Sequence, residues 1–206
     1  MLKIKNIISG QFEVNCYLVY DGTTKACIII DPGEDDKLVI KEIENLELKP
    51  ELLINTHGHF DHILSDDIIR KKYNIPLAIH KDDVDFLSDV NKNASYVIGK
   101  PVTINNPEII FEKEQTYQTS FCKYSIINTP GHTPGSVCIL IDNNLFSGDT
   151  VFAGSIGRTD FPCSSPSAMK KSLQKIKQLD KNIQVYPGHG PSTNMENELS
   201  SNFYLR

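Results

Sequence analysis

Five of the six histidines in this sequence come directly after short apolar segments of strand length. Four such segments lead into polar motifs: "LLIN" (52–55) into "THGHFDH", "YSIIN" (124–128) into "TPGHTPGS", "NLF" (144–146) into "SGD", and "IQVY" (183–186) into "PGHG". Glycines flank these motifs and permit tight turns of the backbone. The chain therefore needs a fold in which several strands end at one place and bring their polar residues together.

The remaining pattern predicts one domain over residues 1–206, built from two similar halves. Short apolar runs bounded by turn residues predict strands at 2–8, 14–20, 26–31, 52–55, 76–80, 124–129, 136–142, 144–148 and 183–188. Amphipathic spacing predicts helices at 37–46, 64–73 and 165–179. The acidic stretch "KDDVDFLSD" (81–89) is typical of a solvated helical turn. The polar region 90–108 is typical of a loop that borders a pocket.

Composition narrows the class of protein. Hydrophobic residues make up 39% of the chain, as in an ordinary globular protein, and the net charge is −5. This acidic balance argues against a nucleic-acid-binding surface, which usually carries a basic face. The apolar runs are far too short to span a membrane, and the N-terminus has no signal-peptide pattern. The five cysteines are scattered with no C-x-x-C pair, so we expect no disulfides and a cytoplasmic location.

The "THGHFDH" motif has the spacing of a metal site. In an extended loop, residues two apart point the same way, so His57 and His59 can bind one ion. Where the loop turns into a helix, Asp61 and His62 point toward a second position. Imidazole and carboxylate ligands without a thiolate favour Zn²⁺, with iron or manganese as alternatives. His80 lies outside these motifs, and we expect it to have a structural role.

The ordered motifs "THGHFDH", "PGHTPGS", "SGDT" and "PGHG" resemble those of the metallo-β-lactamase superfamily, in its short glyoxalase II-like branch. The resemblance implies a four-layer αββα sandwich with metals at one edge. It implies that one metal ion is held by His57, His59 and His132 and a second by Asp61, His62 and His189, with Asp149 bridging them. Few residues follow "GHGPST", so we expect the basic C-terminal helical region of glyoxalase II to be absent.

The resemblance also implies an activity, the hydrolysis of a small-molecule thioester such as S-lactoylglutathione. Two divalent ions can share a hydroxide and polarise the thioester carbonyl, and Asp61 would help to orient that nucleophile. Arg158 in "GRTDF" corresponds to a basic residue of the family, and we expect it to bind a substrate carboxylate or else to form a surface salt bridge.

Three alternatives follow from the same superfamily. Persulfide dioxygenases also carry "GRTDF" and use a single iron, for which the matching residues are His57, His132 and Asp149. A metal-dependent nuclease is disfavoured by the acidic balance and by the lack of an inserted domain. Hydrolysis of β-lactams is disfavoured because a cytoplasmic protein would meet no such target.

Overall fold

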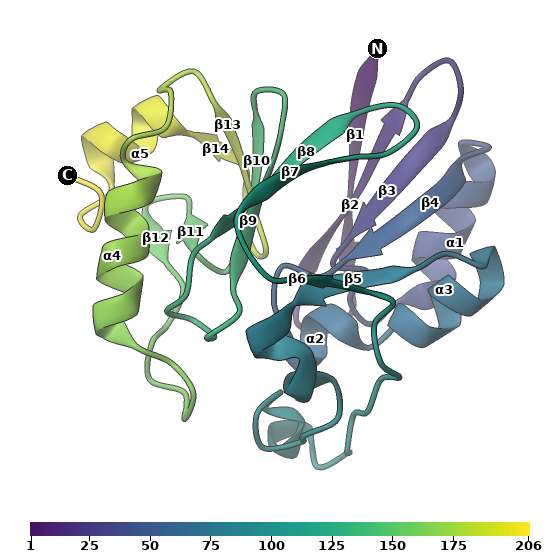
Figure 1. The fold of residues 1–206 in the computed structure, drawn as a ribbon, viewed down its shortest axis with the longest axis horizontal. Helices are drawn as coiled ribbons and strands as arrows, with labels where there is room; N and C mark the ends of the chain where they lie inside the picture. Colours follow the sequence, from purple (N-terminus) through teal and green to yellow (C-terminus); the bar gives the residue numbers. More distant parts are fainter.

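The computed structural model describes residues 1–206 and contains two six-stranded sheets (Figure 1). The strands of the first sheet are β1 (Leu2–Ser9), β2 (Val14–Asp21), β3 (Ala26–Ile30), β4 (Lys49–Ile54), β5 (Leu77–His80) and β6 (Ile109–Phe111), in that order. The second sheet has the order β14 (Thr193–Asn194), β13 (Gln184–Pro187), β10 (Asn144–Gly148), β9 (Val137–Ile141), β8 (Lys123–Asn128) and β7 (Gln115–Gln118). A short hairpin is formed by β11 (Val151–Phe152) and β12 (Ser155–Ile156).

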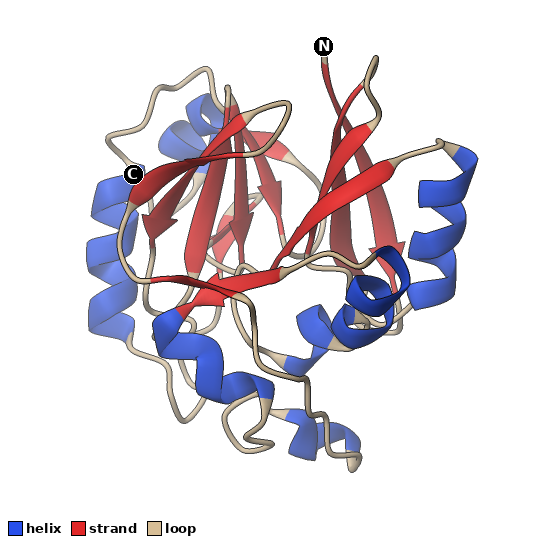
Figure 2. Ribbon diagram, turned by 45° about the vertical axis from the view of Figure 1, so that its right-hand side comes forward, coloured by secondary structure: helices blue, strands red, loops and turns tan.

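Helices cover the outer face of each sheet, so the predicted αββα sandwich is confirmed (Figures 1 and 2). The α-helices are α1 (Asp36–Asn45), α2 (Phe60–Ile63), α3 (Asp66–Tyr73), α4 (Pro166–Ile176) and α5 (Met195–Ser201). Two 3₁₀ segments are η1 (Lys81–Leu87) and η2 (Ser95–Ile98). Ser165 caps α4 by accepting a hydrogen bond from the Ala168 amide, as a capped amphipathic helix requires. None of these helices is long and apolar enough to cross a membrane.

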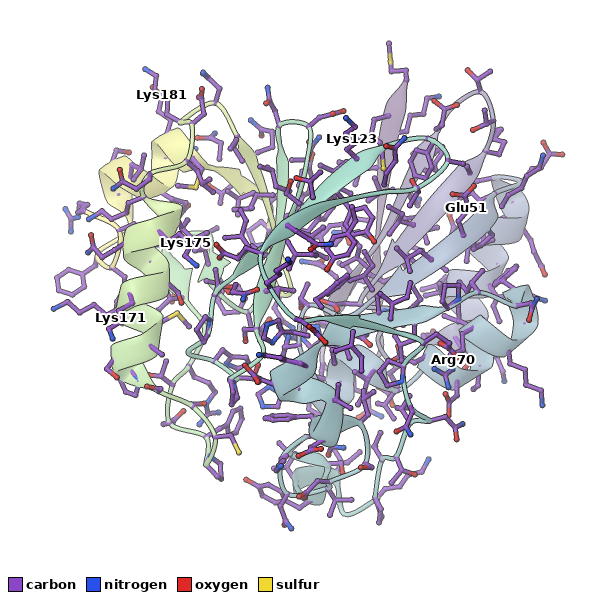
Figure 3. All side chains as sticks on the ribbon, viewed as in Figure 1. Glu51, Arg70, Lys123, Lys171, Lys175 and Lys181 are labelled. Carbon is purple, nitrogen blue, oxygen red and sulfur yellow. The ribbon has the colours of Figure 1, made fainter.

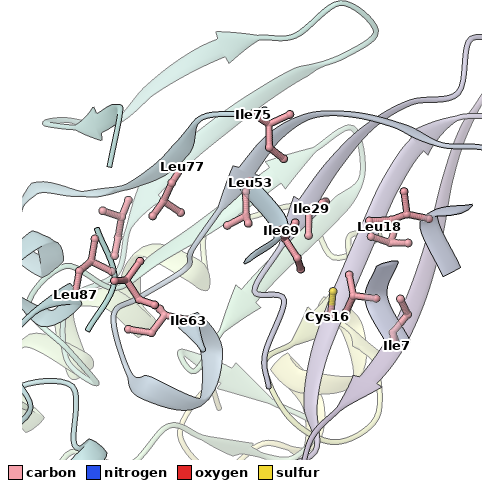
Figure 4. Packing of buried hydrophobic residues seen from close by; sticks show 14 of the residues in the cluster. Ile7, Cys16, Leu18, Ile29, Leu53, Ile63, Ile69, Ile75, Leu77 and Leu87 are labelled. Carbon is pink, nitrogen blue, oxygen red and sulfur yellow. The ribbon is translucent and has the colours of Figure 1, made fainter. Parts of the chain in front are cut away.

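The apolar core lies in three layers because successive residues of a strand face opposite sides of the sheet. On β2, Tyr17 and Val19 pack between the two sheets, whereas Cys16 and Leu18 pack against the helices outside. Figure 4 shows Cys16 and Leu18 in this outer layer with Ile69 of α3. Each fully buried aliphatic side chain contributes roughly 1.5–3 kcal/mol. The central strands are therefore held on both faces, which gives the strand ends a rigid support.

Some elements differ from the sequence-based expectation. The strands β6 and β7 and the helix α5 were not predicted, because β6 has only three residues and because β7 and α5 carry few apolar residues. The helical turn expected at 81–89 is present as η1, and its Lys81, Asp82 and Asp85 are exposed. The expectation was wrong for Asp83, which is completely buried, and Phe86 and Leu87 are buried with it. The segment 90–108 does border a cavity, to which Ala94 and Val97 contribute.

Candidate metal centre

The candidate ligands meet because strands with the same direction end at the same edge of the sandwich. In the first sheet β3, β4 and β5 are parallel, so the residues that follow them lie side by side. In the second sheet β10 and β13 are parallel, which places Asp149 beside His189. The helix α2, which carries Asp61 and His62, lies at the lower end of the sandwich in Figure 1. Ligand sites beyond the carboxyl ends of strands are a general consequence of this geometry.

The first group of side chains consists of His57, His59 and His132, all buried. Their ligand atoms lie within 4.8 Å of one another, and Nδ1 of His59 is 2.8 Å from Nε2 of His132. Nε2 of His57 is buried and has no hydrogen-bond partner. Three imidazoles that point their nitrogen lone pairs at one place are suited to hold a cation.

The surroundings fix the orientation of four histidine rings. Nδ1 of His132 donates to the Arg158 carbonyl at 2.8 Å, and Nδ1 of His189 donates to the Phe12 carbonyl at 2.9 Å. Nδ1 of His62 donates to the Asp31 carboxylate at 3.0 Å. These acceptors have no proton to give, so Nδ1 carries the hydrogen. Nδ1 of His57 is 3.1 Å from the Thr56 hydroxyl, which itself donates to Asp31. Each of the four rings thus turns its Nε2 toward the centre, which is the usual device for orienting a metal-binding histidine.

The second group consists of Asp61, His62 and His189. Nε2 of His189 is 3.4 Å from Oδ2 of Asp61, and Nε2 of His62 is 3.8 Å from the same oxygen. Nε2 of His62 is a buried atom without a hydrogen-bond partner. Each group combines two residues that follow β4 of the first sheet with one histidine that follows a strand of the second sheet, His132 after β8 or His189 after β13. Both groups therefore lie at the end of the sandwich where α2 begins.

Asp149 lies between the two groups. Its Oδ2 is 3.4 Å from Nε2 of His132 in the first group and 3.8 Å from Nε2 of His189 in the second. Its Oδ1 is 3.6 Å from Nε2 of His62 and is buried without a hydrogen-bond partner. A side chain at Gly188 would collide with this carboxylate, so the glycine permits the close approach of the two strand ends. This is the position that a carboxylate shared by two cations requires.

The electrostatic field of the centre differs between the two groups. Burial, reinforced by the neighbouring histidines, holds the pKa values of His57 and His59 well below the usual histidine range, so both are neutral ligands. Burial also lowers the pKa of His62, but Asp61, Asp31 and Asp149 outweigh it and raise that pKa to about 10. The negative potential that favours a proton on His62 also favours a divalent cation, and metal binding would release the proton.

A further carboxylate, Asp31, lies within 4.8 Å of ligand atoms of His57 and His62, but both of its oxygens are engaged in hydrogen bonds, so it positions the ligands. Its Oδ1 accepts a hydrogen bond from the Thr56 amide at 2.8 Å, and its Oδ2 accepts from the Thr56 hydroxyl at 2.6 Å. The same Oδ2 receives the His62 bond. Asp31 was expected only as the last residue of the strand predicted at 26–31 and was not singled out, although it follows β3 just as the predicted ligands follow their strands.

Asp83 was also missed, and it ties together the two loops that carry the first group. Its carboxylate accepts hydrogen bonds from the Gly58 amide at 2.9 Å, from the Gly135 amide at 2.7 Å and from the Thr133 hydroxyl at 2.7 Å. Burial raises the pKa of Asp83 to about 6, although these three bonds act in the opposite direction. The position of Asp83 just after β5 is the signal that could have revealed it.

The structure places Arg158 at the cavity in front of the centre but gives its guanidinium a partner. Nε and Nη2 donate to the two carboxylate oxygens of Asp160 at 2.6 and 2.8 Å, and the guanidinium lies 4.3 Å from the centre of the Phe161 ring. The predicted salt bridge is therefore present, while the carboxylate-binding role stays a prediction. His80 belongs to neither group; it is buried and accepts a weak hydrogen bond from the Asp82 amide at 3.3 Å.

The donor set fits divalent metal ions. Nε2 of His57, Nε2 of His62 and Oδ1 of Asp149 are buried polar atoms without hydrogen-bond partners, a costly arrangement unless a cation satisfies them. All five cysteines are free, and Cys16, Cys27 and Cys138 are completely buried in the apolar layers. The αββα fold and this centre together define a metal-dependent hydrolase. Comparison with known proteins gives the same result and names the family.

The chain belongs to the metallo-beta-lactamase superfamily, whose family pattern matches residues 9–189. It is 30% identical to the "Probable metallo-hydrolase YqgX" of Bacillus subtilis over 99% of this chain and 98% of that protein. It is 31% identical to "Hydroxyacylglutathione hydrolase GloC" of Haemophilus influenzae, again over 99% and 98% of the two chains.

Two solved structures share the fold over nearly the full length. The structure described as "BLEG-1 B3 metallo-beta-lactamase" is 34% identical, with a TM-score of 0.95, and the match covers 98% of this chain and 99% of that one. The structure of TTHA1623 in a di-iron-bound form is 28% identical, with a TM-score of 0.83 and coverage of 98% and 100%. The fold and the class of hydrolase are therefore shown, whereas the names of these proteins differ in substrate and in metal.

Proposed function

We propose that the chain is a thioesterase that uses two divalent metal ions to hydrolyse a small acyl-thiol such as S-lactoylglutathione. The observation that carries this proposal is the pair of ligand groups with Asp149 between them. The likeness to the GloC hydrolase supports the choice of a thioester.

In this proposal His57, His59 and His132 would hold one ion and Asp61, His62 and His189 would hold the other, and Asp149, which lies between the two groups, would serve both. The imidazole and carboxylate donors favour zinc, with iron or manganese as alternatives. When bound, such ions polarise a carbonyl group and lower the pKa of a water molecule.

The residues of the chain have separate tasks in the reaction. The histidines around Asp61 outweigh the effect of burial and hold its pKa well below the usual range, so its carboxylate is ionised and can orient the attacking water. A thiolate is a good leaving group near neutral pH, so the reaction needs no strong general acid. This fits the cavity, whose only lining cation is Arg158 and whose histidines all belong to the two ligand groups.

The test is hydrolysis of S-lactoylglutathione by the purified protein, followed as release of free thiol. We expect turnover that is lost on chelation and restored by zinc, and a strong loss in His57→Ala. Thiol release that is indifferent to chelation would contradict the proposal. Consumption of O₂ with glutathione persulfide by a protein holding one iron would instead support the dioxygenase alternative.

Opening of a β-lactam ring is a second candidate, because the structure described as a B3 metallo-beta-lactamase superimposes with a TM-score of 0.95. Only the expected cytoplasmic location disfavours this activity. A chromogenic cephalosporin distinguishes the two reactions in the same preparation. We expect kcat/KM for the thioester to exceed that for the cephalosporin.

A further inference from the structure

The cavity in front of the metal centre has an apolar lining outside the ligands. It has a volume of about 630 Å³, and the ligands that line it are His59, Asp61, His132, Asp149 and His189. The side chains that surround these ligands include Phe12, Phe60, Val97, Phe152, Ile156 and Phe161. Such a lining binds apolar groups by removing their surface from water.

The aromatic rings flank both ligand groups. The Phe161 ring centre is 5.1 Å from that of His59 in the first group, and the Phe152 ring centre is 6.2 Å from that of His189 in the second. Phe12 packs edge-on against Phe60 with ring centres 4.9 Å apart. A carbonyl group that reaches the centre therefore has apolar walls on both sides.

Charge recognition at the cavity is weak. Arg158 is the only lysine or arginine among the lining residues, and its charge is already balanced by Asp160. Lys171 and Lys175 project from α4, and Arg70 lies on the α3 side of the molecule, all three outside the cavity (Figure 3). A glutathione thioester carries two carboxylates and one ammonium group, and this cavity offers the two carboxylates a single lysine or arginine side chain, that of Arg158.

The mouth of the cavity leaves apolar side chains in water. Val97 in η2 is 54% exposed, and Phe12, from the turn between β1 and β2, is 40% exposed. Apolar groups at the rim of a cavity are a common sign of a binding surface. A substrate with an apolar chain would cover them.

We propose that this cavity selects thioesters with an apolar acyl chain over hydroxyacyl thioesters of glutathione. The inference rests on the proposed thioesterase function and names its substrate class. In the reaction the acyl C–S bond breaks and a C–O bond to the oxygen of water forms. The products are a carboxylate, a thiol and one released proton.

A panel of four thioesters tests the proposal on the metal-loaded protein. Hexanoyl and lactoyl groups are each joined to glutathione and to N-acetylcysteamine, an uncharged thiol, so that acyl and carrier effects are separated. Each buried methylene improves kcat/KM by roughly two- to fourfold, so we expect a preference for hexanoyl of about tenfold or more on either carrier. We expect the carrier to matter less than the acyl group.

Two variants locate the effect. Val97→Ser reduces the apolar lining and should lower the hexanoyl-to-lactoyl ratio of kcat/KM by about two- to fivefold. Ile68→Ser is the matched control, since Ile68 is 50% exposed on α3 and lies outside the cavity. This control should leave the ratio unchanged. A ratio that falls equally in both variants would contradict the assignment to the cavity.

A binding measurement is independent of turnover. The metal-free protein should bind the S-hexyl thioether of N-acetylcysteamine at least tenfold more tightly than the S-methyl thioether, by calorimetry. Equal affinities, or a preference for lactoylglutathione over the hexanoyl thioesters, would overturn the inference while leaving the thioesterase intact. A panel in which no thioester is hydrolysed would overturn the proposed function itself.

Discussion

Oδ2 of Asp31 lies 3.0 Å from Nδ1 of His62, and so a carboxylate from the end of β3 fixes the ring of a residue in α2. Because the same oxygen accepts the Thr56 hydroxyl, one side chain orients both sides of the centre. The bond determines which nitrogen of His62 is free and where it points.

Replacement of Asp31 tests this role. Asp31→Asn keeps the shape but has one acceptor oxygen in place of two, so it cannot satisfy both the Thr56 amide and His62. We expect the affinity for the second metal to fall by about 10- to 100-fold. Competition with a chromophoric chelator measures this affinity, and Asp82→Asn serves as the control because its side chain is 50% exposed. An unchanged affinity would show that His62 does not depend on Asp31.

Asp83 predicts a specific dependence of stability on pH. Its pKa is raised to about 6 in the folded protein, above the value near 4 of an unfolded chain. Between these two pH values the folded state binds more protons than the unfolded state. The contribution of Asp83 to the free energy of unfolding is therefore fully present below pH 4 and is lost as the pH rises through 6. Relative to Asp83→Asn, the free energy of unfolding of the metal-free wild type should fall by up to about 3 kcal/mol between pH 4 and pH 7.

Urea unfolding of the metal-free proteins at several pH values gives these free energies. Asp82→Asn should follow the wild type, because it alters the neighbouring exposed position on the same 3₁₀ segment. A constant difference between wild type and Asp83→Asn across this range would mean that the three hydrogen bonds keep Asp83 ionised throughout.

The salt bridge between Arg158 and Asp160 weakens any interaction of the guanidinium with a substrate carboxylate. Arg158→Ala should raise KM for S-lactoylglutathione by only a few-fold, with a smaller effect on kcat, since a contact remote from the reacting carbonyl is equal in ground and transition states. Asp160→Asn should lower KM for the same substrate, because it frees the positive charge. Steady-state kinetics of both variants decide the question, and a fall in kcat alone would assign Arg158 to shaping the loop that holds His132.

The resemblance carried by the motifs predicted the sandwich, which is confirmed, and the side chains that lie together at its edge, whose roles as metal ligands stay a prediction. It succeeded because apolar strands followed by His, Asp and Gly leave a strong local pattern, as in "THGHFDH". It missed Asp31 and Asp83, whose role arises from parallel strands lying side by side. The carbonyls of Phe12 and Arg158 leave no trace in the sequence, because every residue has one. Side-chain pairing such as that of Arg158 with Asp160 likewise depends on the folded loop.

The variants His189→Ala and Asp149→Ala should differ in the number of metal ions they keep if Asp149 serves both ions. His189 serves only the second group, so His189→Ala should keep one metal and a reduced thioesterase rate. Asp149→Ala should lose both metals, since its carboxylate lies against histidines of both groups and offsets two positive charges held close together. Metal content after dialysis and the thioester rate are measured together for each variant. Equal metal losses in the two variants would contradict the bridging role.

The metal content of the native protein tests the central claim most directly. Metal analysis of the purified chain, after dialysis against metal-free buffer, gives the number of ions per molecule. Two ligand groups that share Asp149 predict a value close to two, whichever metal is bound. A value that stays at one when zinc, iron or manganese is supplied in excess would contradict the two-metal centre.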